Sequence, residues 1–419
     1  MLPSDPEKSR ISLSCPEVAV FFDLAVESAR GILRGFTQYI RLNSPWNVNF
    51  VSKTHSEVDP SSLKNWDGDG ILAHIPNMES LHEILSKRCP TVLLARDIAQ
   101  DLSGCHRPDS PLGPVFVRCD NAAIGKMAAE YFLEKGFRKF AYVPYSRNVC
   151  WCEERRSAFV SALKERGFSV SQFREGTSTY PENMASACSE DVPASDWFSR
   201  REELQHWLEE LPKPAAVFTA NDFRGRQVLE VCQRAGIPVP YDVAVLGVDN
   251  DLPVCEMSYP SLSSIEIDWE RAGRLCGEAL DAMMHGKVPT GEMTYRPIRI
   301  VSRNSTEFFQ VSDRLVVQIL ELIRISRGEN LRVSDIVEAL PVSERSAQER
   351  FKKAVGHSIM EEIKRVRMRN ICRLVEETEL PFNEIALSFG FENANHLGQL
   401  FKKQFGLTMG EYRRKNKRD

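Results

Sequence analysis

The sequence lacks the features of exported, membrane-embedded and disulfide-stabilised proteins. Its 11 cysteines are scattered, and the only close pair, Cys150 and Cys152, is spaced too tightly for a redox or zinc motif. The start of the chain, with Asp5 and Glu7, has no basic-then-apolar leader. No run approaches the roughly 20 apolar residues of a membrane span. We therefore expect a reduced, cytoplasmic protein without a bound metal or cofactor.

Catalytic signatures are also missing. The chain has no Gly-x-Gly-x-x-Gly, no phosphate-binding Gly-x-x-x-x-Gly-Lys, no Gly-x-Ser-x-Gly and no His-Glu-x-x-His. The sequence thus gives no indication of an enzyme, and turnover of a bound small molecule without added cofactor would be needed to support one.

The composition describes a globular protein with two unlike parts. Of its 419 residues, 42% are hydrophobic and 27% are charged, which is enough for two or three packed domains. Residues 312–419 hold 20 Lys and Arg against 16 Asp and Glu, about +4, whereas residues 1–311 hold 34 against 42, about −8. This asymmetry suggests a basic module that contacts nucleic acid, joined to an acidic module with another task.

Residues 15–300 alternate short apolar runs with amphipathic segments, a pattern typical of an α/β fold. It predicts parallel sheets flanked by helices. Its length predicts two lobes, with the chain crossing near Asp120, returning toward residues 260–267 and ending in a strand at Tyr295–Val301. The other expected strands are Val18–Phe22, Val48–Val51, Gly70–Ile75, Thr91–Leu94, Val115–Val117, Phe140–Val143, Ala216–Thr219, Val243–Val248 and Ser264–Ile267. The expected helices are Ala29–Arg41, Ala122–Lys135, Arg155–Arg166, Asp222–Ala235 and Trp269–His285.

The carboxyl-terminal hundred residues contain two helix-turn-helix patterns, and the second is the stronger. Its short first helix should end at Gly390, because a tight turn there needs a residue without Cβ. Asn393 is a natural cap for the next helix, whose inward face we expect to hold Leu397, Leu400 and Phe401. The outward face carries side chains suited to base edges and phosphates: Asn395, His396, Gln399, Lys402 and Lys403.

The first copy begins at Val333, turns at Pro341 and continues in a helix over Glu344–Val355 that Ser343 should cap. A further helix is expected before it, at Arg314–Ser326, and a joining helix after it, at Met360–Glu377. The candidate base contacts of the first copy are Arg345, Ser346, Gln348 and Glu349. Each of these side chains could instead be a solvated residue on a helix surface.

The two copies resemble the DNA-binding domain of AraC/XylS-type transcription factors over about residues 331–413. The residues that carry the resemblance are Asp335-Ile336, Ser343, Arg350-Phe351-Lys352-Lys353, Gly356, Ile385-Ala386, Gly390-Phe391, Phe401-Lys402-Lys403, Gly406 and Tyr412-Arg413. It implies that the second helix of each copy enters a major groove, with the two grooves about 34 Å apart on one face of the duplex. We expect a sensor domain at 1–300, a linker at 301–312 and this DNA-binding domain at 313–419.

Polar residues follow two strands of the α/β part where each strand ends. Asn221 and Asp222 follow one strand, and Asp249 and Asn250 follow another. Ligands of open parallel sheets bind beyond the carboxyl ends of the strands, and these side chains suit the hydroxyls of a polyol. Alternatively, the first pair could be helix caps and the second a simple turn.

Two further residues extend this candidate site. Arg155 could form a forked contact with vicinal hydroxyls, and Trp151 could stack on the apolar face of a sugar. Trp151 could equally be a residue of the hydrophobic core.

These residues, together with Asp120-Asn121 and the segments 236–240 and 260–265, resemble the ligand domain of the lactose/galactose-repressor family. That domain is a two-lobed, periplasmic-binding-protein-like clamp. A clamp of this kind followed by an AraC-type domain resembles the family of xylose operon regulators along nearly the whole chain. The resemblance implies that Asp222, Arg224, Asp249 and Asn250 hold a pentose such as D-xylose.

By the same resemblance Arg155 is the arginine of the clamp, and Arg30 matches a residue near the amino terminus. Ser28 and Ala29 stand where the family has an aromatic and an acidic residue. The implied protein is a sugar-responsive homodimer that binds double-stranded DNA and, as an activator, would contact RNA polymerase. The alternative is a solute-binding receptor for sugar transport, against which the missing leader and the helix-turn-helix pair both count.

Overall fold

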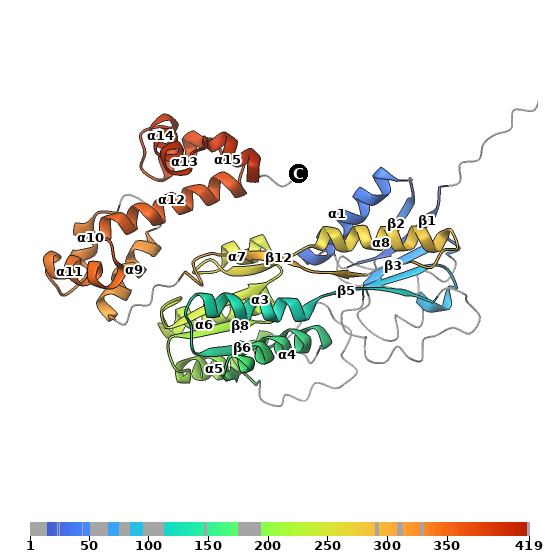
Figure 1. The fold of residues 1–419 in the computed structure, drawn as a ribbon, viewed down its shortest axis with the longest axis horizontal. Helices are drawn as coiled ribbons and strands as arrows, with labels where there is room; N and C mark the ends of the chain where they lie inside the picture. Colours follow the sequence, from blue (N-terminus) through green and yellow to red (C-terminus); the bar gives the residue numbers. More distant parts are fainter. Residues whose placement is uncertain are drawn as a thin grey trace, which may run out of the picture. The chain divides into compact units, whose positions relative to one another are not determined.

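The computed structural model describes residues 15–22, 24, 26–43, 45–50, 66–74, 84–94, 113–145, 149–174, 194–289, 293–307, 313–326 and 331–416 (Figure 1). The chain divides into two compact units, residues 1–307 and residues 308–419. Each unit has a hydrophobic core of its own.

The first unit contains two six-stranded sheets, as the alternation of apolar runs and helices predicts. The first sheet has the strand order β11-β5-β4-β3-β1-β2 and the second the order β12-β10-β9-β8-β6-β7. Among the described residues every strand pairing is parallel except that of β10 with β12. The strands are β1 (Glu17–Phe21), β2 (Asn47–Phe50), β3 (Gly70–His74), β4 (Thr91–Leu94), β5 (Val115–Cys119), β6 (Phe140–Val143), β7 (Val170–Gln172), β8 (Ala215–Thr219), β9 (Val243–Val248), β10 (Ser263–Ile267), β11 (Thr294–Tyr295) and β12 (Pro297–Val301).

The first sheet and helices α1 (Glu27–Leu42) and α8 (Trp269–Met284) form the first lobe. The two helices approach closely through glycines. A Cβ at Gly273 would lie 1.9 Å from the carbonyl oxygen of Ile32, and one at Gly35 would lie 1.9 Å from that of Glu270. No larger residue could occupy either position at this helix separation, so the glycines set how closely the helices pack.

The second sheet forms the second lobe with α3 (Asn121–Glu134), α4 (Cys150–Glu165), α5 (Ala194–Glu210), α6 (Asp222–Ala235) and α7 (Leu252–Met257). One core cluster joins the sheet to α5 and α6. The rings of Tyr142, Phe159 and Phe218 pack together between the sheet and α4. Strand β7 and helices α5 and α7 were not among the elements expected from the sequence; β7 and α7 have only three and six residues.

The chain passes between the lobes three times. It crosses at Asp120, as predicted, and returns at Asp268 just after the predicted segment. The third crossing was missed, since the single strand expected at Tyr295–Val301 is in fact two strands. β11 pairs with β5 in the first sheet, whereas β12 pairs with β10 in the second. Pro297, which has no N–H for a continuous ladder, marks the break. The ends of two expected strands, Val51 and Ile75, lie outside the described residues.

The second unit is helical, with both helix-turn-helix pairs at the expected places. Its helices are α9 (Arg314–Ile325), α10 (Val333–Glu338), α11 (Glu344–Val355), α12 (Ile359–Glu377), α13 (Phe382–Ser388), α14 (Ala394–Phe405) and α15 (Met409–Asn416). Ser343 and Asn393 cap α11 and α14 through their side chains, and Gly390 has a φ of 72° in the turn before α14. Leu397 and Phe401 are fully buried, but Leu400 is 40% exposed. The expectation that Leu400 faces the core was therefore wrong.

Candidate ligand cleft and DNA-reading helices

Arg155 connects four segments at the carboxyl-end edge of the second sheet. The residue is only 3% exposed. Its Nε donates to Asn121 at 3.0 Å, a terminal nitrogen donates to the carbonyl of Ala220 at 2.6 Å, and another lies 3.9 Å from Asp249. The guanidinium also lies 4.6 Å from the ring centre of Trp151. The structure thus brings together Arg155, Asp249 and Trp151, three of the predicted site residues.

The loop after β9 has an unusual backbone. Asp249 and Asn250 have φ values of 108° and 51°, in the region that normally favours glycine. Side chains beneath the loop hold it in place: the Asn250 N–H donates to Ser264 at 3.0 Å, and the Asp251 N–H donates to Asp222 at 2.8 Å. Such backbone conformations persist only where the surroundings impose them, and they gather at ligand sites.

Asp222 lies under this loop, with 1% of its surface exposed. Its carboxylate accepts hydrogen bonds from Ser264, from the Asp251 N–H and from Cys255. Burial, and after it the nearby Asp249 carboxylate, raise the pKa of Asp222 well above its ordinary range. Both oxygens are engaged by the protein, so the residue shapes the loop from below.

Asn221 and Arg224 belong to the start of α6. Asn221 caps the helix by accepting from the Arg224 N–H at 3.0 Å, which is the cap role left open by the sequence. The Arg224 side chain donates to the carbonyl of Pro144 at 2.9 Å and to Gln227 at 2.8 Å, and the residue is 5% exposed.

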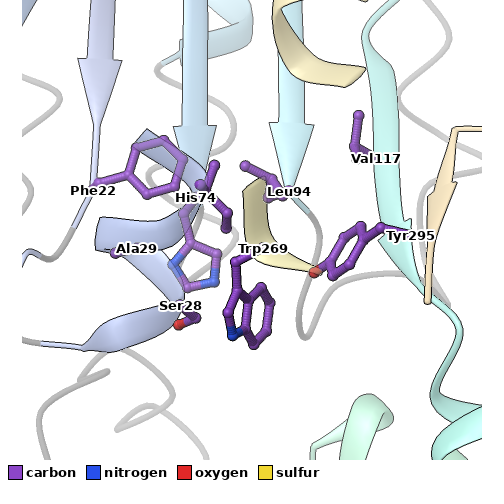
Figure 2. A pocket seen from close by; sticks show the side chains of 9 residues that line it. Phe22, Ser28, Ala29, His74, Leu94, Val117, Trp269 and Tyr295 are labelled. Atoms are coloured by element: carbon purple, nitrogen blue, oxygen red, sulfur yellow. The ribbon is translucent and has the colours of Figure 1, made fainter. Parts of the chain in front are cut away.

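A pocket opens on the first lobe at the carboxyl ends of its strands. Figure 2 shows aromatic side chains around it, with the indole of Trp269 close to the ring of Tyr295. Among the described residues the buried Nε1–H of Trp269 has no hydrogen-bond acceptor. The lining residues are Phe22, Ser28, Ala29, Ile32, His74, Leu94, Val117, Trp269 and Tyr295.

Of the pocket residues, the sequence analysis named only Ser28 and Ala29, which precede Arg30. Phe22, His74, Leu94 and Val117 lie at or near the carboxyl ends of predicted strands, where ligands of open parallel sheets bind, but no polar pair follows those strands to mark a site. A pocket with an apolar aromatic wall and few polar groups is typical of small-molecule sites.

Charged side chains near the pocket and near the loop 249–251 occur in pairs of opposite charge. Arg30 on α1 lies 3.1 Å from Glu27, and Arg155 lies 3.9 Å from Asp249. Burial raises the pKa of Asp251, an increase that a hydrogen bond from the Val254 N–H and the charge of Arg30 on α1 partly offset. Among the residues that the structure describes, no charged side chain lines the pocket itself. The described lining suits an uncharged ligand with hydroxyl groups.

The predicted reading face of α14 is exposed along its length. Asn395, His396, Gln399, Lys402 and Lys403 all reach solvent, while Leu397 and Phe401 anchor the opposite face in the core. The ring of His396 packs edge-on against Phe391 at 5.6 Å between centres. The helix carries no acidic residue, so its outward face is uniformly neutral or positive.

The predicted face of α11 is also exposed but is internally paired. Arg345 lies 3.0 Å from Glu349, and Gln348 donates to Glu344 at 3.0 Å. Ser346 is partly buried, and its N–H lies 3.4 Å from the cap oxygen of Ser343. These contacts would have to open before Arg345 or Gln348 could bond fully to a base.

Two negative results apply to the described part of the chain. It contains no helix long and apolar enough to cross a membrane. It also contains no group of three or more His, Cys, Asp and Glu side chains arranged to hold a metal ion.

Two regions of the chain match known families. Residues 129–306 match the family described as periplasmic binding protein-like domain, and residues 336–415 match a helix-turn-helix domain family. The first region spans most of the second lobe and the exit from it, and the second spans both helix-turn-helix pairs.

Similar proteins extend these matches over the whole chain. The xylose operon regulatory protein of Haemophilus influenzae is 25% identical over 95% of this chain and 98% of its own, and that of Escherichia coli K12 is 25% identical over 94% and 96%. A solved structure of the xylose-binding transcription activator xylR is 24% identical, with a TM-score of 0.78, over 97% of this chain and 100% of that one. The ribose operon repressor of Escherichia coli K12 is 26% identical over 40% of this chain and 45% of its own.

Proposed function

Because this chain is a DNA-binding transcription regulator that joins a periplasmic-binding-protein-like domain to an AraC-type helix-turn-helix domain, we propose that it senses D-xylose or a closely related pentose and activates transcription. The names of the relatives that align along almost the entire chain support the sugar, and the name of the relative with a solved structure supports activation. A receptor for sugar transport is not favoured, because it would have no use for two helix-turn-helix pairs.

The sugar would lie between the pocket of the first lobe and the loop 249–251 of the second. Trp269 carries this assignment, because it lines an aromatic pocket and its buried N–H has no acceptor among the described residues; a ligand hydroxyl would supply one. Arg155, Asp249 and Asn250 would bind further hydroxyls, and Trp151 would complete the aromatic surroundings. Asn221, Asp222, Arg224 and Arg30 would position these groups.

For DNA we propose that α11 and α14 enter successive major grooves. Arg345, Ser346, Gln348 and Glu349 would face bases in one groove, and Asn395, His396 and Gln399 in the other. Lys402 and Lys403 would contact phosphates, for which point charges suffice. We propose a homodimer that works in the cytoplasm, contacts RNA polymerase as an activator and catalyses no reaction.

Calorimetric titration of the full-length protein tests the sensor assignment. We expect D-xylose to bind the wild type. Trp269→Phe should weaken binding about 2- to 10-fold, because it removes one hydrogen bond of about 0.5–1.5 kcal/mol while keeping an aromatic, though smaller, side chain. Asp249→Ala should abolish binding. Asp67→Ala, at the opposite, amino end of β3, is the matched control and should leave binding unchanged. Binding of D-xylose that neither cleft variant disturbs would refute the site.

A further inference from the structure

Arg303 holds together three segments of the second lobe. Its side chain is 2% exposed. Nε donates to Glu256 on α7 at 2.9 Å, one terminal nitrogen donates to the carbonyl of Leu262 at 3.1 Å, and the other donates to the Asn250 side chain at 2.9 Å. A planar guanidinium can serve three partners in fixed directions, whereas an ammonium cannot. One of those partners, Asn250, belongs to the loop of residues 249–251, which we call the ligand loop.

The backbone of Arg303 belongs to the segment by which the chain leaves the first unit. The Arg303 N–H donates to Ser263 at 2.7 Å, and Ser305 donates to the carbonyl of Val245 at 2.6 Å. Thr306 lies 2.6 Å from the hydroxyl of Tyr131. The second unit begins at Phe308. Arg303 therefore contacts the ligand loop with its side chain, while its backbone is part of the segment that leaves the sensor.

The conformation of Asn250 in the ligand loop is supported by two neighbouring residues. Asn250 has a φ of 51°, a left-handed conformation that asparagine tolerates better than most residues. Ser264 holds its backbone, and Arg303 holds its side chain. A ligand hydroxyl bonded to Asn250 would redirect or strengthen that second contact. Because Arg303 is buried and charged, it cannot lose a partner without a compensating movement.

We propose that Arg303 is a positioning residue that couples occupancy of the cleft, through Asn250, to the segment leading into the DNA-binding unit. The proposal rests on the proposed function, in which Asn250 contacts the sugar. Coupling of this kind is reciprocal: if D-xylose changes the affinity for DNA by some factor, DNA changes the affinity for D-xylose by the same factor. Arg303 would determine the size of that factor without touching either ligand.

The variant Arg303→Lys tests this, with Arg299→Lys as its matched control. Arg299 lies on β12, four residues before Arg303, and also pairs with a glutamate, Glu266, at 2.9 Å, but on the strand ladder rather than at the ligand loop. The affinity of the full-length protein for a duplex selected from a random pool is measured with and without saturating D-xylose. Direct titration gives the affinity for D-xylose.

We expect Arg303→Lys to reduce the coupling factor at least fivefold, while the affinity for D-xylose and the affinity of the sugar-free protein for DNA stay within about threefold of wild type. The control should keep the wild-type coupling factor. Should Arg303→Lys fold poorly, Glu256→Gln loosens the same guanidinium more gently and should lower the coupling in the same direction. Unchanged coupling in a folded variant would overturn the proposal.

Hydrogen exchange of the sugar-free protein supplies a readout that does not depend on the identity of the sugar. Arg303→Lys should speed the exchange of amides in residues 249–251 and 302–306 at least fivefold and leave β8 unchanged. A uniform increase across the lobe would mean that Arg303 only stabilises the fold, and would reject the proposal. If D-xylose fails to bind the wild type, the sugar assignment falls, and the exchange pattern alone decides the role of Arg303.

Discussion

Arg350 on α11 donates two hydrogen bonds to the carboxylate of Asp313, the residue that caps α9, and the distance from Nε to Oδ2 is 2.8 Å. The pair ties the start of the first described helix of the second unit to the first reading helix. The Arg350 guanidinium is therefore already bonded within its own domain. Arg345, on the same helix, is the better candidate for a base contact.

Removing the charge of Arg350 should make the second unit less stable at neutral pH only. The guanidinium lowers the pKa of Asp313, so its contribution is present above the unfolded pKa of about 3.9 and is lost as the pH falls through the lower folded value. Arg350→Gln should thus melt at a lower temperature near neutrality and match the wild type in strong acid. Arg345→Gln, which breaks a much more exposed ion pair, is the control. A deficit that persisted unchanged into acid would contradict this account.

Two glycine-to-alanine substitutions should change stability in opposite directions. At Gly273 a Cβ would lie 1.9 Å from a carbonyl oxygen of α1, so Gly273→Ala should destabilise the sensor by at least about 1–3 kcal/mol. At Gly398 in α14 the nearest contact is 3.8 Å, so Gly398→Ala should stabilise the helical unit by up to about 1 kcal/mol. Urea denaturation of each variant measures both effects, and a stabilised Gly273→Ala would show that α1 and α8 can move apart freely.

Leu397 and Leu400 offer a second comparison on α14. Leu397 is fully buried among Ile385, Phe389 and Phe401, so Leu397→Ala should cost about 2–5 kcal/mol of unfolding free energy. Leu400 is 40% exposed, and Leu400→Ala should stay within about 0.5 kcal/mol of wild type. Chemical denaturation followed by circular dichroism distinguishes them. Equal costs would mean that Leu400 is covered in solution.

Affinity for DNA should depend on salt through the lysines of α14. Each lost phosphate contact lowers the slope of log affinity against log salt by about 0.9. Lys403→Gln should therefore weaken binding at low salt and flatten the slope by about that amount, as measured by fluorescence anisotropy. Lys287→Gln, exposed on the first unit, should change neither quantity. An unaltered slope for Lys403→Gln would remove that residue from the phosphate contacts.

Local signals predicted much of the fold. The bounds of α6 and α11 match the expectation because their caps, Asn221 and Ser343, lie immediately before each helix in sequence. The strands were found because both faces of a parallel sheet are buried, which leaves continuous apolar runs. Leu400 was misjudged for a related reason: helical periodicity places it beside Leu397, but the neighbouring helices cover only a narrow stripe of α14.

The ligand cleft could be predicted only in part. In the second lobe, Asp249 was proposed because it is a polar residue that follows a strand, and Arg155 because of the family resemblance; their side chains lie 3.9 Å apart at one edge of the sheet. The pocket of the first lobe was not predicted, because the strands that end at Phe22 and His74 are not followed by the polar pairs that marked the second lobe, and Trp269 joins them from α8, which is distant in sequence. The break at Pro297 was missed likewise, because it depends on which sheet each strand joins.

The third crossing between the lobes has a consequence for building chimaeric regulators. Because β12 returns to the second lobe, Thr306 near the end of the sensor forms hydrogen bonds with Ser263 and Tyr131, which come from distant parts of the chain. A graft joined at residue 300, where the domain was expected to end, would remove these hydrogen bonds. A foreign output domain attached there should not respond to the sugar. A graft joined after Glu307 would carry the complete sensor, and should transfer sugar control to a new target.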